Sequence, residues 1–167
     1  MKQGITESEF IGLFNKYFRV LKNYIYYKTG NTELSEDIVQ DSFLKLWEKR
    51  EEVRLATAVQ LLYTISGNLC KNRFEHQQVV LKFTNKYQNT SQQSSPEFEM
   101  ELKEFDNKLQ SAISGLGEKS RIVFLMNRID GLTYNQIADN LDITVKAVEK
   151  RMKKALDSLA EKIEYRI

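Results

Sequence analysis

The chain has 167 residues, of which 41% are hydrophobic and 29% are charged, so it can build one or two small folded domains and is not a wholly disordered protein. No stretch approaches the roughly 18 to 20 apolar residues of a membrane span, and the N-terminus lacks the apolar segment of a secretory signal, so we expect a cytoplasmic protein without membrane insertion. The formal net charge is only +2, so any nucleic-acid partner must be sought in the distribution of charge rather than in its total.

The spacing of apolar residues predicts an all-α fold. They recur mostly at intervals of three and four, and the chain holds one proline and seven glycines. The single cysteine, Cys70, and the single histidine, His76, leave no internal disulfide and no ligand set for structural zinc. We therefore expect neither a metal nor another cofactor.

Two helices are expected at the start of the chain. Thr6 and Glu9 form a capping box for the first, which should run to about Lys28. Its apolar residues at helical spacing are Phe10, Leu13, Phe14, Tyr17 and Leu21. Ser35 is the expected N-cap of the second, which should run to about Arg50. The buried stripe of this second helix is expected to be Val39, Phe43, Leu46 and Trp47.

A third helix is expected from about Thr57 to Phe74, after a charged loop. Residues 84–95 are rich in Asn, Gln, Ser and Thr, the composition of a flexible linker. Ser95 and Pro96 then give an N-cap and a first-turn proline for a fourth helix, and Gly115 and Gly117 end it. The chain is thus expected to contain two helical domains, residues 1–83 and 96–167, joined by a polar linker.

A helix-turn-helix is expected over residues 132–159. Thr133 and Gln136 form a capping box for its first helix, and Thr144 can cap its second. Residues 140–142 supply the turn, because Asn and Asp tolerate a positive φ. The core face of the second helix is expected to consist of Val148, Met152, Ala155, Leu156 and Leu159.

The opposite face of this second helix is basic. Residues 144–154 hold five basic residues and one acidic residue, a net charge of +4. A helix in the major groove would present such cations to phosphates and base edges. The alternative is an ordinary solvated lysine face, but the two caps and the tight turn favour DNA binding.

Two parts of the sequence resemble one bacterial family. Residues 37–47, DIVQDSFLKLW, closely resemble the second conserved region of extracytoplasmic-function sigma factors, the small promoter-specificity subunits of RNA polymerase, and residues 62–73 continue that region. Residues 130–159, beginning DGLTYNQIA, are similar to the family's fourth region. The resemblance covers both expected domains in family order and omits only the linker, residues 84–95.

The resemblance implies a role for each part of the N-terminal domain. The second helix would dock on core RNA polymerase, and the residues expected to bind it are Asp37, Gln40, Asp41, Leu44 and Trp47. The following loop and the third helix would read the minus-ten element and hold the melted non-template strand. The residues expected there are Arg50, Arg54, Asn68, Lys71 and Arg73, each of which could equally be a solvated surface residue. Phe43 and Trp47 could instead belong to the core.

The C-terminal helix-turn-helix would read the minus-thirty-five element on double-stranded DNA. Thr144 and nearby backbone amides would meet phosphate. Val145, Lys146, Ala147 and Lys150 would lie closest to the floor of the groove, and Arg151, Lys153 and Lys154 would anchor the DNA backbone. Family members are often held inactive by an anti-sigma factor, so the resemblance also implies an inhibitory partner.

A few positions depart from the family pattern. Asp142 stands where glycine is common, which a turn still permits. Glu149 stands where a basic residue is frequent, which argues against a phosphate contact there. Leu61, Ser66 and Gly67 replace residues often found in the third helix, so strand melting would depend more on the preceding loop.

Two other classes of function are alternatives to a sigma factor, which performs no covalent chemistry. A stand-alone, dimeric helix-turn-helix regulator would bind DNA without polymerase, on half-sites about one helical turn apart. An enzyme acting on nucleic acid would need a metal-ligand cluster, a Gly-rich phosphate loop or a hydroxyl–histidine–acid set, and the sequence offers none of these.

Overall fold

The computed structural model describes residues 3–74, 79–83 and 95–163. Within these ranges it contains α-helices and no strand, which confirms the all-α fold class. The helices are α1 (Glu7–Thr29), α2 (Thr32–Glu48), α3 (Leu55–Arg73), α4 (Pro96–Ser114), α5 (Glu118–Arg128), α6 (Tyr134–Leu141) and α7 (Val145–Lys162).

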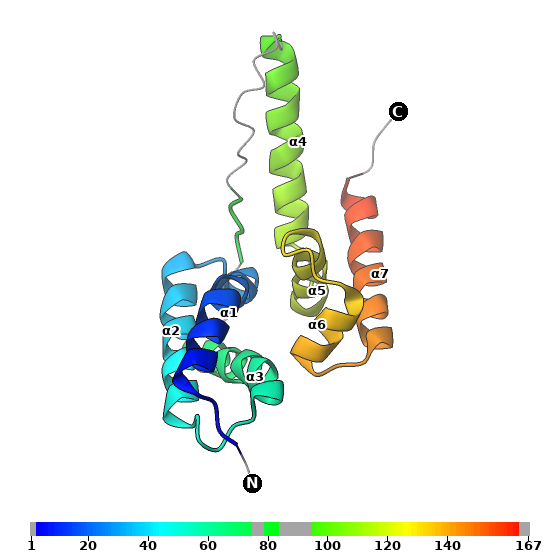
Figure 1. Ribbon diagram of the computed structural model, residues 1–167. Coiled ribbons are helices and arrows are strands. Elements are labelled where there is room, and N and C mark those ends of the chain that lie inside the picture. The colour runs from blue at the N-terminus through cyan, green and yellow to red at the C-terminus, as the bar shows by residue number, and fades with distance from the viewer. Residues whose placement is uncertain (1–2, 75–78, 84–94, 164–167) are drawn as a thin grey trace.

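The first three helices pack on one another and form the N-terminal half of the molecule (Figure 1). Their core is apolar and closed to solvent at Leu21, Ile25, Ile38, Leu46 and Leu62. In the C-terminal half, α5, α6 and α7 pack around Ile137, Met126, Val148 and Met152, which belong to the same cluster of buried residues. The N-terminal part of α4 extends beyond this core, so that Phe98, Met100 and Leu102 are exposed (Figure 1).

The capping box at the start of α1 is confirmed. The Thr6 backbone N–H donates to the Glu9 carboxylate at 2.9 Å, and the Glu9 N–H donates to Thr6 Oγ1 at 3.2 Å. The helix ends at Gly30, whose φ of 66° is left-handed. A Cβ at this position would lie 2.7 Å from the carbonyl oxygen of Val80, so both the conformation and the close approach of the chain require glycine.

The expected start of the second helix is wrong by one turn. Its N-cap is Asn31, whose side chain accepts from the Leu34 N–H at 3.0 Å. Ser35 lies inside the helix, where its hydroxyl donates back to the Asn31 carbonyl at 2.6 Å. Asn and Ser are both good N-caps. Because the left-handed Gly30 ends α1 and lets α2 begin directly after it, Asn31 is the N-cap rather than Ser35.

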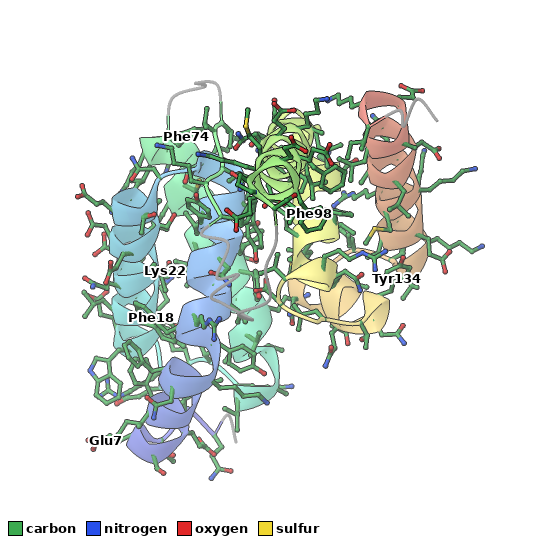
Figure 2. The ribbon with its side chains drawn as sticks, turned by 90° about the horizontal axis from the view of Figure 1, so that it is seen from above. Glu7, Phe18, Lys22, Phe74, Phe98 and Tyr134 are labelled. Carbon is green, nitrogen blue, oxygen red and sulfur yellow. The ribbon has the colours of Figure 1, made fainter. Side chains whose placement is uncertain are left out.

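The two halves are in contact. The C-terminal part of α1 packs against α5, and α3 packs against α6. Consequently α2 and α7 lie at opposite outer edges of the molecule (Figures 1 and 2). None of the described helices has the length and hydropathy of a membrane span.

Candidate nucleic-acid and partner interfaces

The helix-turn-helix is built by the side chains expected to build it. Thr133 Oγ1 accepts from the Gln136 N–H at 3.2 Å, and Gln136 Oε1 accepts from the Thr133 N–H at 2.9 Å. Thr144 Oγ1 accepts from the Ala147 N–H at 3.1 Å, which caps α7. Between the helices, Asp142 has a left-handed φ of 53°, the conformation expected for the turn. These caps fix the angle at which α7 leaves the turn.

Asp142 gives a direct test of this turn. Because a non-glycine residue in the left-handed region is strained, we expect Asp142→Gly to raise the free energy of unfolding by up to about 1 kcal/mol. Asp142→Val should lower it by about 1 to 2 kcal/mol, since a β-branched residue tolerates this conformation least. Urea unfolding of both variants measures the effect, and two variants of equal stability would contradict the described turn.

One face of α7 is buried and the other is basic and exposed. The buried residues are Val148, Met152, Ala155 and Leu159. Leu156, expected in the core, is 42% exposed. It lies about 80° from Val148 on the helical wheel, at the margin of the buried stripe, where the neighbouring helices no longer cover it.

The residues expected to read the distal element remain accessible on α7. Thr144, Lys146, Lys150, Lys153 and Lys154 are exposed, whereas Val145, Ala147 and Arg151 are half-buried. In the view from above, long side chains extend outward from α7, away from the rest of the molecule (Figure 2). The structure therefore presents this set together on one solvent-facing helix.

A second accessible surface is an apolar groove between α1 and α2. It is lined by Phe10, Ile11, Phe14, Gln40, Phe43, Leu44 and Trp47, with Glu7 at its edge. Leu44 is 60% exposed and Ile11 51% exposed, unusual values for apolar side chains that share a groove. Gln40, Leu44 and Trp47 of this groove were expected to bind polymerase. We call these lining residues the α1–α2 groove.

The sequence does not predict that residues of α1 contribute to this exposed groove. Phe10 and Phe14 fit the apolar stripe of the first helix and were assigned to it, yet Phe14 is 39% exposed. The available signal was Ile11, an apolar residue that falls beside the stripe rather than on it. Phe43 is a core residue at 2% exposure, which confirms the alternative considered for it. Trp47 is half-buried, with its ring centroid 4.9 Å from that of Phe10.

The two acidic residues of the expected polymerase surface differ in their surroundings. Asp37 is exposed in the second turn of α2. Asp41 instead forms an ion pair with Arg73 of α3, with 2.7 Å between Oδ2 and Nη1. The sequence predicts that Asp41 binds polymerase and that Arg73 binds the proximal promoter element, but the fold pairs the two residues with each other.

The five residues expected to contact the proximal element do not form one patch. Arg50 stacks on Trp47 at 4.0 Å and donates to the Trp47 carbonyl, so it sits beside the α1–α2 groove. Arg54 is exposed at the N-cap of α3, and Arg73 faces α2. Asn68 and Lys71 line a cleft between the two halves. On α3, Arg73 points about 140° away from Asn68, which separates them.

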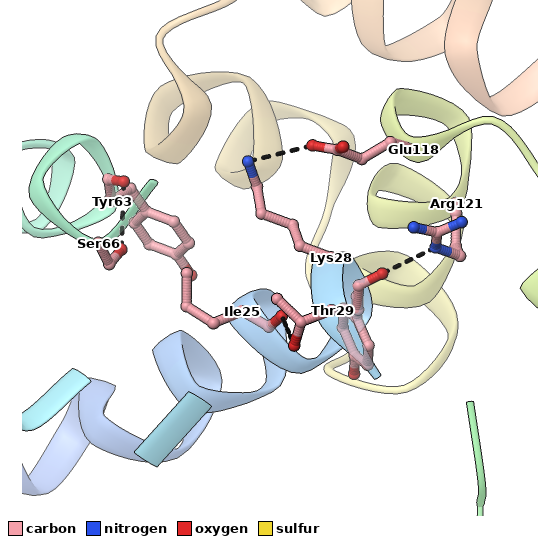
Figure 3. A network of polar contacts seen from close by, with 8 residues as sticks. Ile25, Lys28, Thr29, Tyr63, Ser66, Glu118 and Arg121 are labelled. Atoms are coloured by element: carbon pink, nitrogen blue, oxygen red, sulfur yellow. Dashed lines mark hydrogen bonds and ion pairs between the residues drawn. The ribbon is translucent and has the colours of Figure 1, made fainter. Parts of the chain in front are cut away.

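Polar groups join the two halves across α1 (Figure 3). Arg121 of α5 is 4% exposed and donates to the carbonyls of Tyr27 at 2.7 Å, Leu116 at 2.9 Å and Ser114 at 3.2 Å. Burial lowers the pKa of Arg121, but the guanidinium stays protonated at neutral pH. Lys28 forms an ion pair of 3.2 Å with Glu118. Helical periodicity does not indicate these contacts, because they join residues that are far apart in the sequence.

A second polar contact involves Asp130, in the turn after α5. Its Oδ1 accepts from Asn23 at 2.8 Å and from the Tyr27 hydroxyl at 3.2 Å. Burial raises the pKa of Asp130, although both hydrogen bonds act to lower it. Burial is also the main cause that raises the pKa of Tyr27 and of Tyr63. The end of α1 is thus the main polar meeting point of the two halves.

The comparison with protein families decides the identity. Sigma-70 region 2 matches residues 13–89, and sigma-70 region 4 matches residues 106–159. The chain belongs to the extracytoplasmic-function group of the sigma-70 family. The first match contains α2, α3 and most of α1, and the second contains the helix-turn-helix, in the order that the sequence indicated.

Curated relatives agree with this assignment to the sigma family. The chain is 27% identical to the ferric citrate uptake sigma factor FecI of Escherichia coli over 160 residues, which cover 93% of this chain and 92% of the relative. It is 27% identical to the ECF RNA polymerase sigma-E factor of Haemophilus influenzae over 139 residues, 77% of this chain and 74% of the relative. These matches confirm promoter-specific initiation as a sigma factor and do not favour a stand-alone regulator.

Two solved structures share the fold. The sigma factor RpoE of Bartonella quintana, in complex with the anti-sigma factor NepR, has a TM-score of 0.65 at 16% identity and covers 96% of this chain and 99% of its own. CnrH, in complex with the cytosolic domain of CnrY, has a TM-score of 0.61 at 21% identity, over 93% of this chain and 88% of its own. Among the described residues there is no cluster of His, Cys, Asp and Glu that could hold a metal ion.

Proposed function

We propose that this sigma factor binds core RNA polymerase through the α1–α2 groove and carries it to a two-part promoter, whose distal element is read by α7. The observation that carries the proposal is the separation of the two surfaces. An apolar groove and a basic recognition helix lie at opposite outer edges of the molecule, so polymerase and duplex DNA can be held simultaneously (Figures 1 and 2). The protein would act in the cytoplasm, where its polymerase partner works.

The chemistry of the groove suits a protein partner. Exposed Leu44 and Ile11 supply apolar area that a partner would cover, and Trp47 supplies an aromatic anchor of the kind common at interface hot spots. Gln40 and Asp37 are exposed nearby on α2 and would give the contact its polar, acidic rim. Asp41 would contribute to this rim while it remains paired with Arg73.

The distal element would be read by the exposed face of α7. Lys146 and Lys150, with Val145 and Ala147, would lie closest to the base edges. Arg151, Lys153 and Lys154 would hold the phosphates, and the Thr144 hydroxyl would donate to a phosphate while its oxygen still caps the helix.

For the proximal element we propose a narrower set than the sequence indicated. Arg54 is exposed at the start of α3, and Asn68 and Lys71 are exposed on one side of that helix, beside the cleft between the halves, so these three would meet the melted strand. Arg50 and Arg73 are held by Trp47 and Asp41, and they would act mainly through those residues.

A phosphate contact has a measurable signature. Lys153→Gln should weaken promoter binding by the polymerase–sigma complex to a similar degree on all promoters, and it should reduce the slope of log affinity against log salt by about one unit. The matched control is Lys103→Gln on α4, an exposed lysine outside the helix-turn-helix, which should change neither quantity. A loss confined to one promoter base would instead assign Lys153 to base readout.

An anti-sigma factor is a further proposed partner. The support is that the sigma factor RpoE of Bartonella quintana, which shares the fold, was crystallised with the anti-sigma factor NepR. CnrH, which also shares the fold, was solved with another protein segment, the cytosolic domain of CnrY. Purification of the tagged chain from its native host tests this, and repeated recovery of polymerase alone would count against it.

A further inference from the structure

A further cavity lies beside the C-terminal part of α4, outside both surfaces described above. Its volume is about 1110 Å³, and its walls come from residues 79–83, α4, Arg121 of α5 and Lys162 of α7. It shares no described lining residue with the α1–α2 groove. Small-molecule sites usually have volumes of roughly 300 to 1,000 Å³, so this cavity can hold a metabolite as large as a nucleotide. We call it the α4 cavity.

The wall formed by residues 79–83 is fixed by hydrogen bonds. Leu81 is 2% exposed, and its N–H donates to the Ser114 hydroxyl of α4 at 3.1 Å. The Tyr26 hydroxyl of α1 accepts from the Lys82 N–H at 2.8 Å and donates to the Lys82 carbonyl at 2.9 Å. The backbone of Lys82 is therefore held in place, and its exposed side chain leaves from a fixed point beside the cavity.

The charged residues that line the α4 cavity are all basic. They are Lys82, Lys108, Arg121 and Lys162, and no described lining residue is acidic, which gives a formal charge of +4. Within the described part of the chain, none of these four residues forms an ion pair. A concave site lined by one sign of charge attracts ions of the opposite sign. The cavity therefore has the electrostatics of an anion-binding site.

Arg121 is the most buried charged group of this set, with 4% of its surface exposed. Its three hydrogen bonds to carbonyls use Nε and Nη1 and none uses Nη2 (Figure 3). The buried side-chain atoms without a partner in the described residues are Asp130 Oδ2 and the Tyr63 hydroxyl, so Nη2 is not closed off from solvent. Carbonyls hold the guanidinium in place but do not cancel its charge. A fixed charged donor loses little conformational entropy when a ligand binds.

Lys162 points away from the DNA-facing side of α7. On the helical wheel it lies about 40° from the core residue Val148, whereas Lys150 and Lys153 lie about 140° to 160° from it. The Lys162 Nζ lies 2.9 Å from the position that a Cβ on Gly115 would occupy, so the amine reaches the end of α4. The dipole of α4 favours a cation there, which accounts for this lysine but not for the other three cations of the set.

The charge of the set indicates a ligand with more than one phosphate. A phosphate monoester carries a charge of about −1.5 to −2 at neutral pH, so a single one leaves about half of the +4 uncompensated. Lysine binds phosphate as a point charge, and an arginine N–H donates to its oxygens. The buried position of Arg121 favours the terminal phosphate of a small molecule over the internal phosphates of a nucleic-acid strand.

We propose that the α4 cavity binds a small molecule with two or more adjacent phosphate groups, as in a nucleoside triphosphate or inorganic polyphosphate. The terminal phosphate accepts from Arg121 Nη2, and the three lysines hold the remaining phosphate oxygens. The apolar side chains of Val79, Val80 and Ala112 border the rest of the ligand. The site lies apart from the surfaces proposed for polymerase and DNA, so this inference does not depend on the function proposed above.

Titration calorimetry of the full chain at low ionic strength tests the proposal, with inorganic tripolyphosphate and then ATP as the probes. We expect one molecule of probe to bind per chain. The double variant Lys108→Gln and Lys162→Gln should weaken the affinity for tripolyphosphate at least about tenfold. The matched double variant Lys150→Gln and Lys153→Gln removes the same charge from the other side of α7, and should change this affinity by less than about twofold. Circular dichroism checks that both variants fold.

The outcomes separate the possible ligands without any need for polymerase or promoter DNA. Tighter binding of ATP than of tripolyphosphate would support the proposal and identify a nucleotide, whereas the opposite order would support it and identify inorganic polyphosphate. Equal losses in the two double variants would overturn the proposal, because they would indicate diffuse attraction of a polyanion to a basic chain. It would also be overturned if neither probe bound, or if only a single-stranded oligonucleotide depended on Lys108 and Lys162.

Discussion

Ile137→Ala is expected to destabilise the helix-turn-helix by about 2 to 4 kcal/mol. Ile137 is fully buried, and only Ile137 and Ala138 of α6 are buried. A helix of 8 residues is too short to be stable alone, so α6 exists because this side chain packs against α5 and α7. The total free energy of unfolding of a folded unit of this size is about 3 to 10 kcal/mol, so the substitution removes a large part of its stability.

Amide hydrogen exchange measures this effect where it occurs. Exchange should accelerate in α6 and in the first turns of α7, while the amides of α2 stay protected. The affinity for DNA should fall in proportion to the fraction of molecules in which the helix-turn-helix is ordered. The control is Asn135→Ala, a change on the exposed face of the same helix, which should leave exchange unaltered. If Ile137→Ala left α6 as protected as in the wild type, the packing described for this helix would be wrong.

Leu44→Lys is expected to weaken the affinity for core polymerase by about 30-fold or more. Leu44 lines the α1–α2 groove and is 60% exposed, so a lysine there leaves the fold intact but places a charge where the partner would bury apolar area. Truncated or charged hot-spot residues typically cost about 2 kcal/mol or more, which corresponds to this change in affinity.

The matched control is Leu55→Lys, an exposed leucine at the start of α3 that does not line the groove. Both variants should unfold at the concentration of denaturant at which the wild type unfolds, and only Leu44→Lys should lose affinity in a titration of labelled protein with core polymerase. Equal affinity of all three proteins would remove the groove from the polymerase interface.

The sequence predicted the features that depend on neighbours along the chain. The caps at Thr6, Thr133 and Thr144 and the left-handed turn at Asp142 are confirmed, because each is decided within about four residues. The start of α2 is wrong because two good caps compete, and the choice depends on how Gly30 ends the preceding helix.

Features that depend on distant parts of the chain could not be predicted in this way. Helical periodicity places Leu156 on the core face, but no neighbour covers it. Helical periodicity does not show that Arg73 pairs with Asp41. Nor does it show that Arg121, which stands at the start of an apolar run, donates a hydrogen bond to a carbonyl of α1. The division of the proposed promoter-contacting residues over several surfaces follows from such tertiary contacts.

The division into two domains at residues 84–95 remains a prediction. The family matches end at residue 89 and resume at residue 106, and residues 84–94 lie outside the described part of the chain. The contacts of residues 79–83 with α4 add a point that composition did not indicate, since this segment, assigned to the N-terminal domain, also touches the C-terminal half.

Transcription in vitro, with core polymerase from the native host and fragments of its genome, tests the central claim most directly. The account predicts that adding this chain produces new RNA 5′ ends, and that the upstream DNA of these starts shares two elements about 25 base pairs apart. It also predicts that Leu44→Lys abolishes these starts while Leu55→Lys retains them. Failure of the chain to direct a start at any genomic site would contradict the account.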